Sequence, residues 1–330
     1  LQEFPCGGQY YLESNREWDE GVFEICRDWA DGIFLGAVGW PGANLASGEP
    51  AGKNVLFGLR LGLDLFANFR PVKLYPGVRH RIHERWLQVW EPAEVDLLIV
   101  RENTEGMYSP FRGTLARGGV EELALDTRMI SQKAARRVVN LAFSEAKRRA
   151  LQKGRRPRVS CVDKSNVLDG CRLFRKVFRE VAEENDDTEV DEWYIDSFCQ
   201  ALLWEPQSFD VAVMPNLFGD IASDVAAVLG GGLGLAPSWQ SNGDKALFEP
   251  VHGSAPNLAQ TGRANPLAAV LSLTKLLYFC GVPRASNALE DCVIELLSQG
   301  RLLPYDLGGG ASCEAVLHEL LRLLKEKYTP

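Results

Sequence analysis

The stretch FDVAVMPNLFGDIASD, residues 209–224, decides the class of fold. Its apolar run, residues 211–214, predicts a strand that is buried on both faces, and PNLFGDIASD predicts a helix directly after it. Asp220 and Asp224 stand four residues apart and therefore share one helical face. Two carboxylates beside the carboxyl end of a strand suit a hard divalent cation. A structural alternative stays open at this point, in which Asp220 caps the helix and Asp224 is solvated.

The same order of strand and helix recurs along the chain. Apolar runs at residues 33–35, 97–100 and 159–162 predict further buried strands. Apolar residues recur at helical spacing in three segments, residues 130–149, 171–184 and 221–229. Residues 264–280 are apolar on nearly every side and predict a buried or interface helix. The alternation predicts an α/β fold, and 330 residues suffice for two lobes or one large domain.

The composition excludes several classes of protein. A formal net charge of −8 argues against nucleic-acid binding, which needs a concentrated basic surface. No apolar run approaches the roughly 18 residues of a membrane span, and the start, LQEFPCGGQYYLES, lacks the regions of a signal peptide. The eight cysteines form no CxxC pair and are expected to be reduced core residues. These features predict a cytoplasmic protein with neither a nucleic acid nor a membrane as partner.

Three arginines adjoin apolar runs and are candidates for binding carboxylates. Arg60, Arg70 and Arg101 stand in LFGLR, DLFANFRPVK and LLIVRENTEG. Arg101 directly follows a predicted strand, where α/β enzymes bind ligands in a crevice. Guanidinium groups match carboxylates in a bidentate manner, so the three together would suit a di- or tricarboxylate. Each of them alone could equally be an ordinary surface arginine.

Two further side chains are candidates for proton transfer. Tyr108 follows the Arg101 strand in RENTEGMY, and Lys164 follows another predicted strand in CVDKSN. A tyrosine and a lysine beside a metal ion can act as acid and base near neutral pH, although each could instead be structural.

Asp196, at the end of EWYID, could complete the set of metal-binding carboxylates. His80 and His83, in RHRIH, lack acidic or cysteine companions and are expected at the surface.

The loop EPVHGSAPN, residues 249–257, is a candidate for nucleotide binding. Its small residues allow the backbone to approach a nucleotide and present several N–H groups. The chain contains neither GxGxxG nor GxxxxGK[ST], so neither a Rossmann nor a Walker phosphate loop is expected.

These segments, in this order, resemble the β-decarboxylating dehydrogenases, which include isocitrate, isopropylmalate, homoisocitrate, tartrate and D-malate dehydrogenases. The resemblance extends from CGGQYYLESNREW and FLGAVGWPG to DLGGGAS. It implies a two-lobed α/β fold, distinct from the Rossmann fold, with the active site in the cleft between the lobes. The expected lobes are a larger, discontinuous cofactor-binding lobe of residues 1–65 and 231–330, and a smaller lobe of residues 66–230 with substrate, metal and dimer contacts. The family normally begins with a strand and a glycine-rich turn, and this sequence starts after them.

The resemblance also implies an activity, the oxidative decarboxylation of a malate-type 2-hydroxy acid, and a role for each candidate residue. The arginines would bind the substrate carboxylates, Tyr108 would protonate the enol, and Lys164 would be the general base. Mg²⁺ or Mn²⁺ would be held by Asp196, Asp220 and Asp224. In the family, the lysine and one of the aspartates come from the second subunit, which implies an obligate homodimer with shared active sites.

The coenzyme and the substrate side group are inferred from the same resemblance. The implied cofactor-binding residues are His252, Gly253, Ser254, Ala255, Pro256, Asn257 and Asn265. Asn257 stands where most NAD-using relatives have aspartate. Asn257-Leu258 also lacks the Lys-Tyr pair of NADP-specific isocitrate dehydrogenases. NAD is therefore the expected coenzyme, and NADP is not excluded. The side group would be read by residues just before Arg60 and by one residue of the partner: Lys53, Asn54, Leu56, Phe57 and Val167.

The side-group residues leave several substrates open. Leu56, Phe57 and Val167 would form an apolar wall that suits an alkyl group, whereas Lys53 or Asn54 could meet a polar or anionic one. The expected substrate is 3-isopropylmalate or a close analogue, with tartrate, D-malate, isocitrate and homoisocitrate as alternatives. A non-catalytic regulatory subunit of a hetero-oligomeric dehydrogenase is the alternative of another class.

Overall fold

The computed structural model describes residues 1–328, and the chain forms two compact units. Unit 1 comprises residues 1–65, 70–95 and the chain from residue 227 onward, and unit 2 comprises residues 66–69 and 96–226. The predicted α/β class is confirmed, since parallel strands alternate with helices in unit 2. The expected smaller lobe, residues 66–230, includes residues 70–95 and 227–230, which here belong to unit 1.

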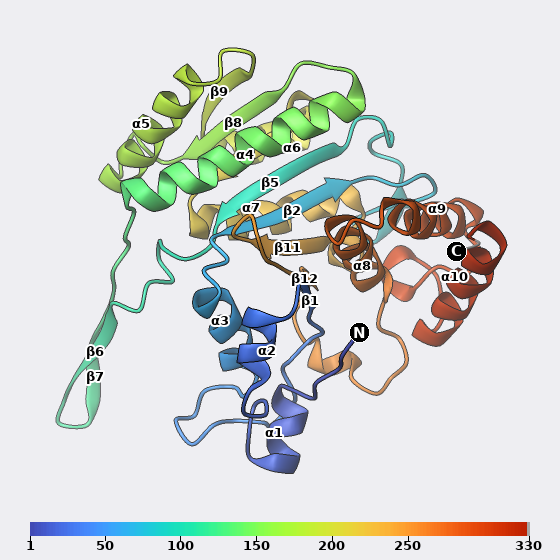
Figure 1. The fold of residues 1–330 in the computed structure, drawn as a ribbon, viewed down its shortest axis with the longest axis horizontal. Coiled ribbons are helices and arrows are strands. Elements are labelled where there is room, and N and C mark those ends of the chain that lie inside the picture. The colour runs from blue at the N-terminus through green and yellow to red at the C-terminus, as the bar shows by residue number, and fades with distance from the viewer. Residues whose placement is uncertain (329–330) are drawn as a thin grey trace. The chain divides into compact units, whose positions relative to one another are not determined.

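Unit 2 is built on four parallel strands in the order β5 (Asp96–Glu102), β10 (Val211–Met214), β8 (Arg158–Asp163) and β9 (Glu189–Tyr194). Helix α4 (Gln132–Lys153) packs across β5, β10 and β8, and α5 (Asp169–Glu183) packs beside it (Figure 1). Helix α6 (Ile195–Trp204) contacts β8 and β9, and α7 (Asn216–Ala227) follows β10. The interiors of β5, β10 and β8 are buried, as their apolar runs predict, whereas β9 is exposed or half-buried along its length.

The long helix α4 shows how the sequence sets an element's ends. The Ser131 hydroxyl accepts a hydrogen bond from the Ala134 N–H at 3.1 Å and so caps the first turn. Gly154 ends the helix with a left-handed backbone, φ 63°, that favours glycine. The predicted end of the helix near Gly154 is confirmed.

Helix α7 begins at Asn216, directly after strand β10 as PNLFGDIASD predicts, and five residues before the segment of helical spacing, 221–229. Its first helical hydrogen bond runs from the Gly219 N–H to the Pro215 carbonyl at 2.9 Å, directly after strand β10. Asp220 therefore lies inside the helix, and the alternative in which it caps the helix is wrong.

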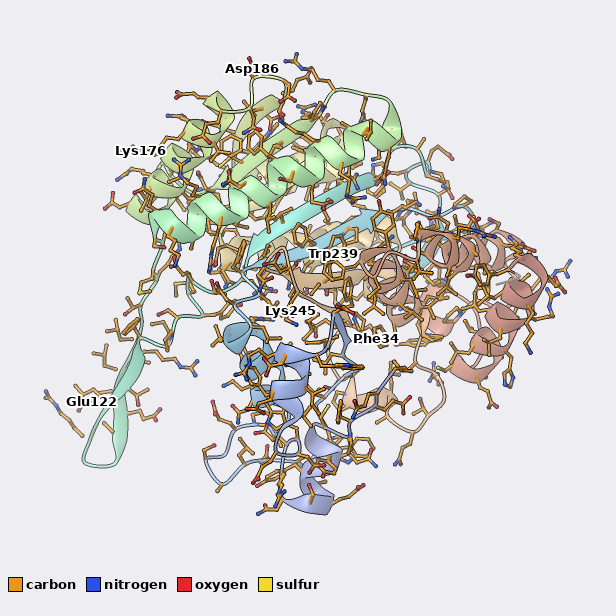
Figure 2. All side chains as sticks on the ribbon, in the orientation of Figure 1. Phe34, Glu122, Lys176, Asp186, Trp239 and Lys245 are labelled. Carbon is orange, nitrogen blue, oxygen red and sulfur yellow. The ribbon has the colours of Figure 1, made fainter. Side chains whose placement is uncertain are left out.

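One hairpin of unit 2 stands apart from its sheet. Strands β6 (Arg112–Arg117) and β7 (Val120–Asp126) form an antiparallel ribbon in which every residue is exposed. Figure 2 shows its side chains, Glu122 among them, clear of the rest of this unit.

Unit 1 contains β1 (Gly32–Phe34) parallel to β12 (Ala246–Pro250), and β11 (Pro237–Ser241) antiparallel to β12. A small hairpin joins β3 (His80–Ile82) to β4 (Arg85–Leu87), and β2 (Ala67–Lys73) runs from unit 2 into unit 1. The helices of unit 1 are α1 (Gly8–Ser14), α2 (Val22–Asp28), α3 (Lys53–Gly62), α8 (Leu267–Phe279), α9 (Pro283–Gln299) and α10 (Cys313–Lys327). Short 3₁₀ turns complete the described chain at Pro206–Ser208, Val228–Gly230, Leu233–Leu235, Pro256–Leu258 and Tyr305–Leu307.

Hydrogen bonds explain why residues 70–95 belong to unit 1. Lys73 Nζ and Tyr75 Oη donate to Glu290 of α9, at 2.6 and 3.3 Å. His80 is buried, and both of its ring nitrogens have partners inside unit 1. Nε2 lies 2.9 Å from the Leu229 carbonyl oxygen, and Nδ1 accepts from the Val89 N–H at 3.4 Å. The surface prediction is therefore wrong for His80, whereas His83 is exposed as expected.

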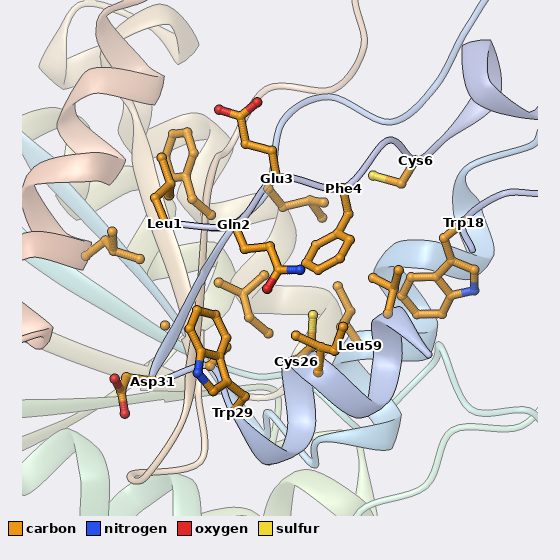
Figure 3. A pocket seen from close by; sticks show the side chains of 18 of the residues that line it. Leu1, Gln2, Glu3, Phe4, Cys6, Trp18, Cys26, Trp29, Asp31 and Leu59 are labelled. Atoms are coloured by element: carbon orange, nitrogen blue, oxygen red, sulfur yellow. The ribbon is translucent and has the colours of Figure 1, made fainter. Parts of the chain in front are cut away.

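The apolar helix α8 is largely covered within unit 1, with only Tyr278 exposed between residues 267 and 279. Unit 1 also contains a cavity of about 690 Å³, shown in Figure 3, whose lining includes Phe4, Cys26, Trp29 and Leu59. Within residues 1–328 no helix is both long and apolar enough to cross a membrane.

All eight cysteines are free, but they are not uniformly buried. Cys26, Cys161, Cys171 and Cys292 are buried, whereas Cys280 is exposed. The expectation of core cysteines therefore holds for some of them and is wrong for Cys280.

Candidate active site

Arg101, Tyr108 and Asp220 come together in unit 2 around one carboxylate. The Arg101 guanidinium donates through Nη1 to Asp220 Oδ1, and Tyr108 Oη donates to Asp220 Oδ2 at 2.9 Å. The guanidinium also lies over the Tyr108 ring, 5.6 Å from its centroid. Arg101 is 3% exposed and Tyr108 is 47% exposed, so a buried cation orients an accessible phenol.

Asn216, which the sequence analysis did not select, completes this cluster. Its Oδ1 accepts from Arg101 Nε at 3.0 Å and from Nη2 at 2.7 Å, while its Nδ2 donates to the Glu105 carbonyl at 2.7 Å. The first residue of α7 thus fixes both the arginine and the RENTEGMY loop. The feature of the sequence that could have indicated this role is the position of Asn216 directly after strand β10 and Pro215.

Two glycines allow the close approach of these elements. A Cβ on Gly219 would lie 2.6 Å from Arg101 Cβ and Cγ, and one on Gly106 would lie 2.9 Å from Asn216 Cβ. Gly106 also has φ +90°, which side chains rarely adopt.

The loop that carries Tyr108 is held by its own carboxylates. Buried Glu102 accepts from the Thr104 N–H at 2.9 Å and from the Glu105 N–H at 2.8 Å. Burial raises the pKa of the Glu102 carboxyl, although these hydrogen bonds oppose the shift. Glu105 in turn accepts from the N–H and the hydroxyl of Ser131, both at 2.7 Å.

Lys164 forms a second polar group in unit 2, with Asp196. Lys164 Nζ and Asp196 Oδ1 form an ion pair, and this hydrogen bond lowers the pKa of Asp196. Neighbouring Asp163 is buried and accepts two 2.8 Å hydrogen bonds from Arg175 Nε and Nη2, which anchors the turn that presents Lys164. Val167 is exposed three residues further on.

The predicted metal ligands separate into two places. Asp220 and Asp224 lie one turn apart on α7, whereas Asp196 lies in the first turn of α6 with Lys164. Within the described part of the chain no three His, Cys, Asp or Glu side chains form a metal-binding group. The donors on α7 are carboxylate oxygens, which fit Mg²⁺ or Mn²⁺ and supply part of the six oxygen ligands that such ions take.

In unit 1, Arg60 and Arg70 are buried, at 7% and 9% exposure, so neither is an ordinary surface arginine. Arg60 Nε donates to Gln240 Oε1 at 2.8 Å, and Gln240 Nε2 donates to Glu249. The guanidinium of Arg60 also lies over the ring of Phe57, 5.1 Å from its centroid. Gln240 was missed because it lies 180 residues from Arg60 in the sequence.

The side-group residues on α3 have partners of their own. Asn54 donates from Nδ2 to Glu17 Oε2 at 2.7 Å, and Lys53 Nζ pairs with Glu49 at 2.5 Å. Leu56 packs against the core cluster of unit 1, which contains Val22, Leu59 and Leu65. The structure thus places Leu56 on the inner side of α3, while Asn54 is exposed.

The candidate coenzyme loop follows β12. His252 Nδ1 lies 3.0 Å from the Gly253 carbonyl oxygen, Ser254 Oγ accepts from the Gly39 N–H at 2.9 Å, and Ala255 has a left-handed φ of 41°. Pro256 and Asn257 form a 3₁₀ turn.

Asn265 is held in place beside this loop by two partners. Its Nδ2 donates to Asp306 at 3.0 Å, and its Oδ1 accepts from the Leu267 N–H at 2.9 Å. Asp306, in DLGGG, is a further residue that the sequence analysis did not select. It packs closely against Gly234, where a Cβ would meet Asp306 Oδ2 at 2.0 Å, and both of these contacts join residues far apart in the sequence.

Comparison with known proteins gives consistent matches over the whole chain. Residues 1–320 match the family model described as isocitrate/isopropylmalate dehydrogenase. A protein of Methanocaldococcus jannaschii named 3-isopropylmalate/3-methylmalate dehydrogenase is 38% identical over 324 residues, 97% of this chain and 89% of that protein. The 3-isopropylmalate dehydrogenase of Bacillus subtilis is 38% identical over 301 residues, 89% of this chain and 79% of that protein. The crystal structure of isocitrate dehydrogenase from Methylococcus capsulatus is similar with a TM-score of 0.85 and 30% identity, covering 97% of this chain and 89% of that one.

Proposed function

Because this chain belongs to the isocitrate/isopropylmalate dehydrogenase family, we propose that it oxidises and decarboxylates a 3-substituted malate, with 3-isopropylmalate as the main substrate. The observation that carries the proposal is the cluster in which buried Arg101 and exposed Tyr108 converge on Asp220. It combines a carboxylate-binding cation, a proton donor and a metal-binding carboxylate. These are the groups that the reaction needs.

Each side chain has one task in the proposed reaction. Lys164 takes the proton of the C2 hydroxyl while the C2 hydride leaves, so that the alcohol becomes a ketone. The bond between C3 and its carboxylate then breaks, CO₂ leaves, and the electron pair remains as an enolate. Tyr108 gives a proton to C3, which yields the 2-keto acid. Buried guanidinium groups bind the substrate carboxylates, and we assign this task to Arg60, Arg70 and Arg101.

Two bound groups would assist these residues. NAD⁺, for which we assign residues 252–257 and Asn265, supplies the hydride acceptor. Mg²⁺ or Mn²⁺, held by Asp220 and Asp224 together with Asp196 of the partner subunit, supplies positive charge where the oxyanion develops.

A homodimer is part of the proposal, and the β6–β7 hairpin supports it. Leu115 and Leu123 face each other across its strands, Leu125 lies on the same face, and the three side chains are 45%, 58% and 61% exposed. A two-stranded ribbon with an exposed apolar face is marginally stable alone, and a second copy would cover it. The separation of Asp196 from the α7 carboxylates fits the same arrangement, because a partner would then supply the third carboxylate.

The test is a substrate panel with the full-length protein. NADH formation is followed with Mn²⁺ and NAD⁺ on 3-isopropylmalate, D-malate, tartrate, isocitrate and homoisocitrate, with NADP⁺ in parallel. The proposal predicts the highest kcat/KM for 3-isopropylmalate with NAD⁺. A preference for another of these acids would overturn the assigned substrate. Activity that arises only on mixing with a different family member would indicate a regulatory subunit.

A further inference from the structure

Helix α3 carries Lys53, Asn54, Leu56 and Phe57, which the family resemblance predicts to read the substrate's 3-substituent. Its first turn has no side-chain cap from its own N-cap residue. Its N-cap is Gly52, which has no side chain and a φ of 99°. The orphan N–H groups of a helical first turn need an acceptor. Here a residue 35 positions earlier supplies it.

Glu17 is that acceptor, and it holds Asn54 as well. Glu17 Oε1 accepts from the Gly52 N–H at 2.6 Å and from the Asn54 N–H at 3.3 Å, and Oε2 accepts from Asn54 Nδ2 at 2.7 Å. A carboxylate can only accept, so the Asn54 amide must turn its NH₂ group toward Glu17. Asn54 Oδ1, an acceptor, is therefore turned away from Glu17.

The segment that follows Glu17 fixes the rest of α3. The Trp18 ring lies against Gly58, where a Cβ would meet Cη2 and Cζ2 at 3.3 Å. Phe23 lies against Gly62, where a Cβ would lie 2.6 Å from its ring, and the two aromatic rings contact each other at 6.3 Å between centroids. These contacts leave α3 little freedom to shift when the charge at its first turn changes.

The charge around this turn is unfavourable for an anion. Lys53, the neighbouring cation on α3, is paired with Glu49 at 2.5 Å, and the charged group that contacts Asn54 is the Glu17 carboxylate. A substrate whose 3-substituent carries a carboxylate would meet the Asn54 carbonyl oxygen and the negative charge of Glu17. An alkyl, hydrogen or hydroxyl substituent would not be repelled.

We infer that Glu17 is a positioning residue that sets substrate choice, by orienting Asn54 and by repelling a third carboxylate, so that the enzyme selects malates with an uncharged 3-substituent. This inference rests on the proposed function and on the predicted role of Asn54 in reading the 3-substituent. It narrows the substrate class, since it separates 3-alkylmalates from isocitrate and homoisocitrate.

The test compares Glu17→Gln with Glu20→Gln. The first removes the charge and keeps an acceptor for Gly52, and the second removes the same charge from an exposed side chain of the same segment. For the parent and both variants, one measures the KM for 3-isopropylmalate and the inhibition constant of isocitrate against it. The ratio of these two constants is taken within one protein preparation, so partial unfolding of a variant does not change it.

We expect isocitrate to bind Glu17→Gln about tenfold more tightly relative to 3-isopropylmalate, since one repulsive charge is gone. Glu20→Gln should keep the parent's ratio, and Glu17→Asp, which restores the charge, should return the ratio toward it. A ratio in Glu17→Gln within twofold of the parent would overturn the role of Glu17. A parent that turns over no 3-substituted malate would instead overturn the proposed function on which the role depends.

Discussion

Tyr108 is the side chain whose removal separates catalysis from binding most clearly. Tyr108→Phe deletes the proton donor and its 2.9 Å hydrogen bond to Asp220 while keeping the ring beneath Arg101. We expect kcat to fall about 100-fold, within the usual contribution of a general acid, with a smaller change in KM. Steady-state kinetics with 3-isopropylmalate measure both constants.

A matched control exists in unit 1. Tyr10 Oη donates to Asp19 at 2.6 Å, so Tyr10→Phe removes the same kind of hydrogen bond from a side chain that has no assigned role in the reaction. Its kcat should stay within about twofold of the parent. Equal losses in the two variants would show that Tyr108 supports the fold and is not the acid.

The residues that sequence reasoning found and those it missed differ in a physical way. Arg101, Tyr108 and Asp220 were recognisable because each stands next to an apolar run or on a helical face. Glu17, Gln240 and Asp306 act through contacts with residues far away in the sequence, and no local pattern marks such contacts.

At the level of elements, the packing of α7 on β5 depends on Gly219. A Cβ there would lie 2.6 Å from Arg101 Cβ and Cγ, and the buried arginine cannot move aside freely. Gly219→Ala should lower the free energy of unfolding by about 2 kcal/mol, which is typical of overpacking, and should reduce kcat/KM because Arg101 shifts. Denaturant unfolding and steady-state kinetics measure the two effects.

Gly310→Ala serves as the control for this substitution, because Gly310 is exposed and no atom lies within 4 Å of its Cβ position. It should leave kcat/KM unchanged. If Gly219→Ala behaves in the same way, α7 is not seated on Arg101 as described.

Glu290 of α9 ties β2 and α8 together and gives unit 1 a pH dependence. Burial alone would raise its pKa, but the charges and hydrogen bonds of Lys275 and Lys73 outweigh burial and lower the pKa from 4.5 to about 2. The folded-state pKa is depressed, so the stabilisation is fully present above pH 4.5 and is lost as the pH falls toward 2. Its size at neutral pH is about 3 kcal/mol.

Glu290→Gln should therefore lower the free energy of unfolding by about that amount at pH 7 and by progressively less below pH 4.5. Urea unfolding of parent and variant at several pH values measures the difference. A difference that does not vary between pH 7 and pH 3 would contradict the assigned ion pairs.

The sequence predicts elements well where burial dictates the pattern. The strands β5, β8 and β10 are uninterrupted apolar runs and were located to within two residues at each end. The β6–β7 hairpin was not predicted. All of its residues are exposed within the chain, so its sequence lacks the alternation of buried apolar and exposed polar residues that marks a strand. Helical spacing alone marked α7 only from residue 221, because Pro215 and Asn216, at the start of the helix, have low helix propensity.

For the whole molecule, the β6–β7 hairpin gives the proposed dimer a direct test. A double variant, Leu115→Asp with Leu123→Asp, places two charges on the exposed apolar face of the ribbon. We expect the molar mass from light scattering to fall to that of one chain, with loss of activity because Asp196 and Lys164 would no longer reach a partner's site.

The polar face of the ribbon supplies the control. Thr114 and Ala124 form a facing pair on the side opposite the leucines, and Thr114→Asp introduces a charge there. This variant should remain dimeric. A double leucine variant that stays dimeric and active would show that the hairpin does not join two copies.

The central claim is that one chain type carries out both oxidation and decarboxylation of 3-isopropylmalate. The most direct measurement is the stoichiometry of a complete reaction, with NADH followed by absorbance and CO₂ released from substrate labelled in the 3-carboxylate. The account predicts one NADH and one CO₂ for each 3-isopropylmalate consumed, with both products lost together in Lys164→Met. NADH without CO₂, or turnover in Lys164→Met close to that of the parent, would contradict it.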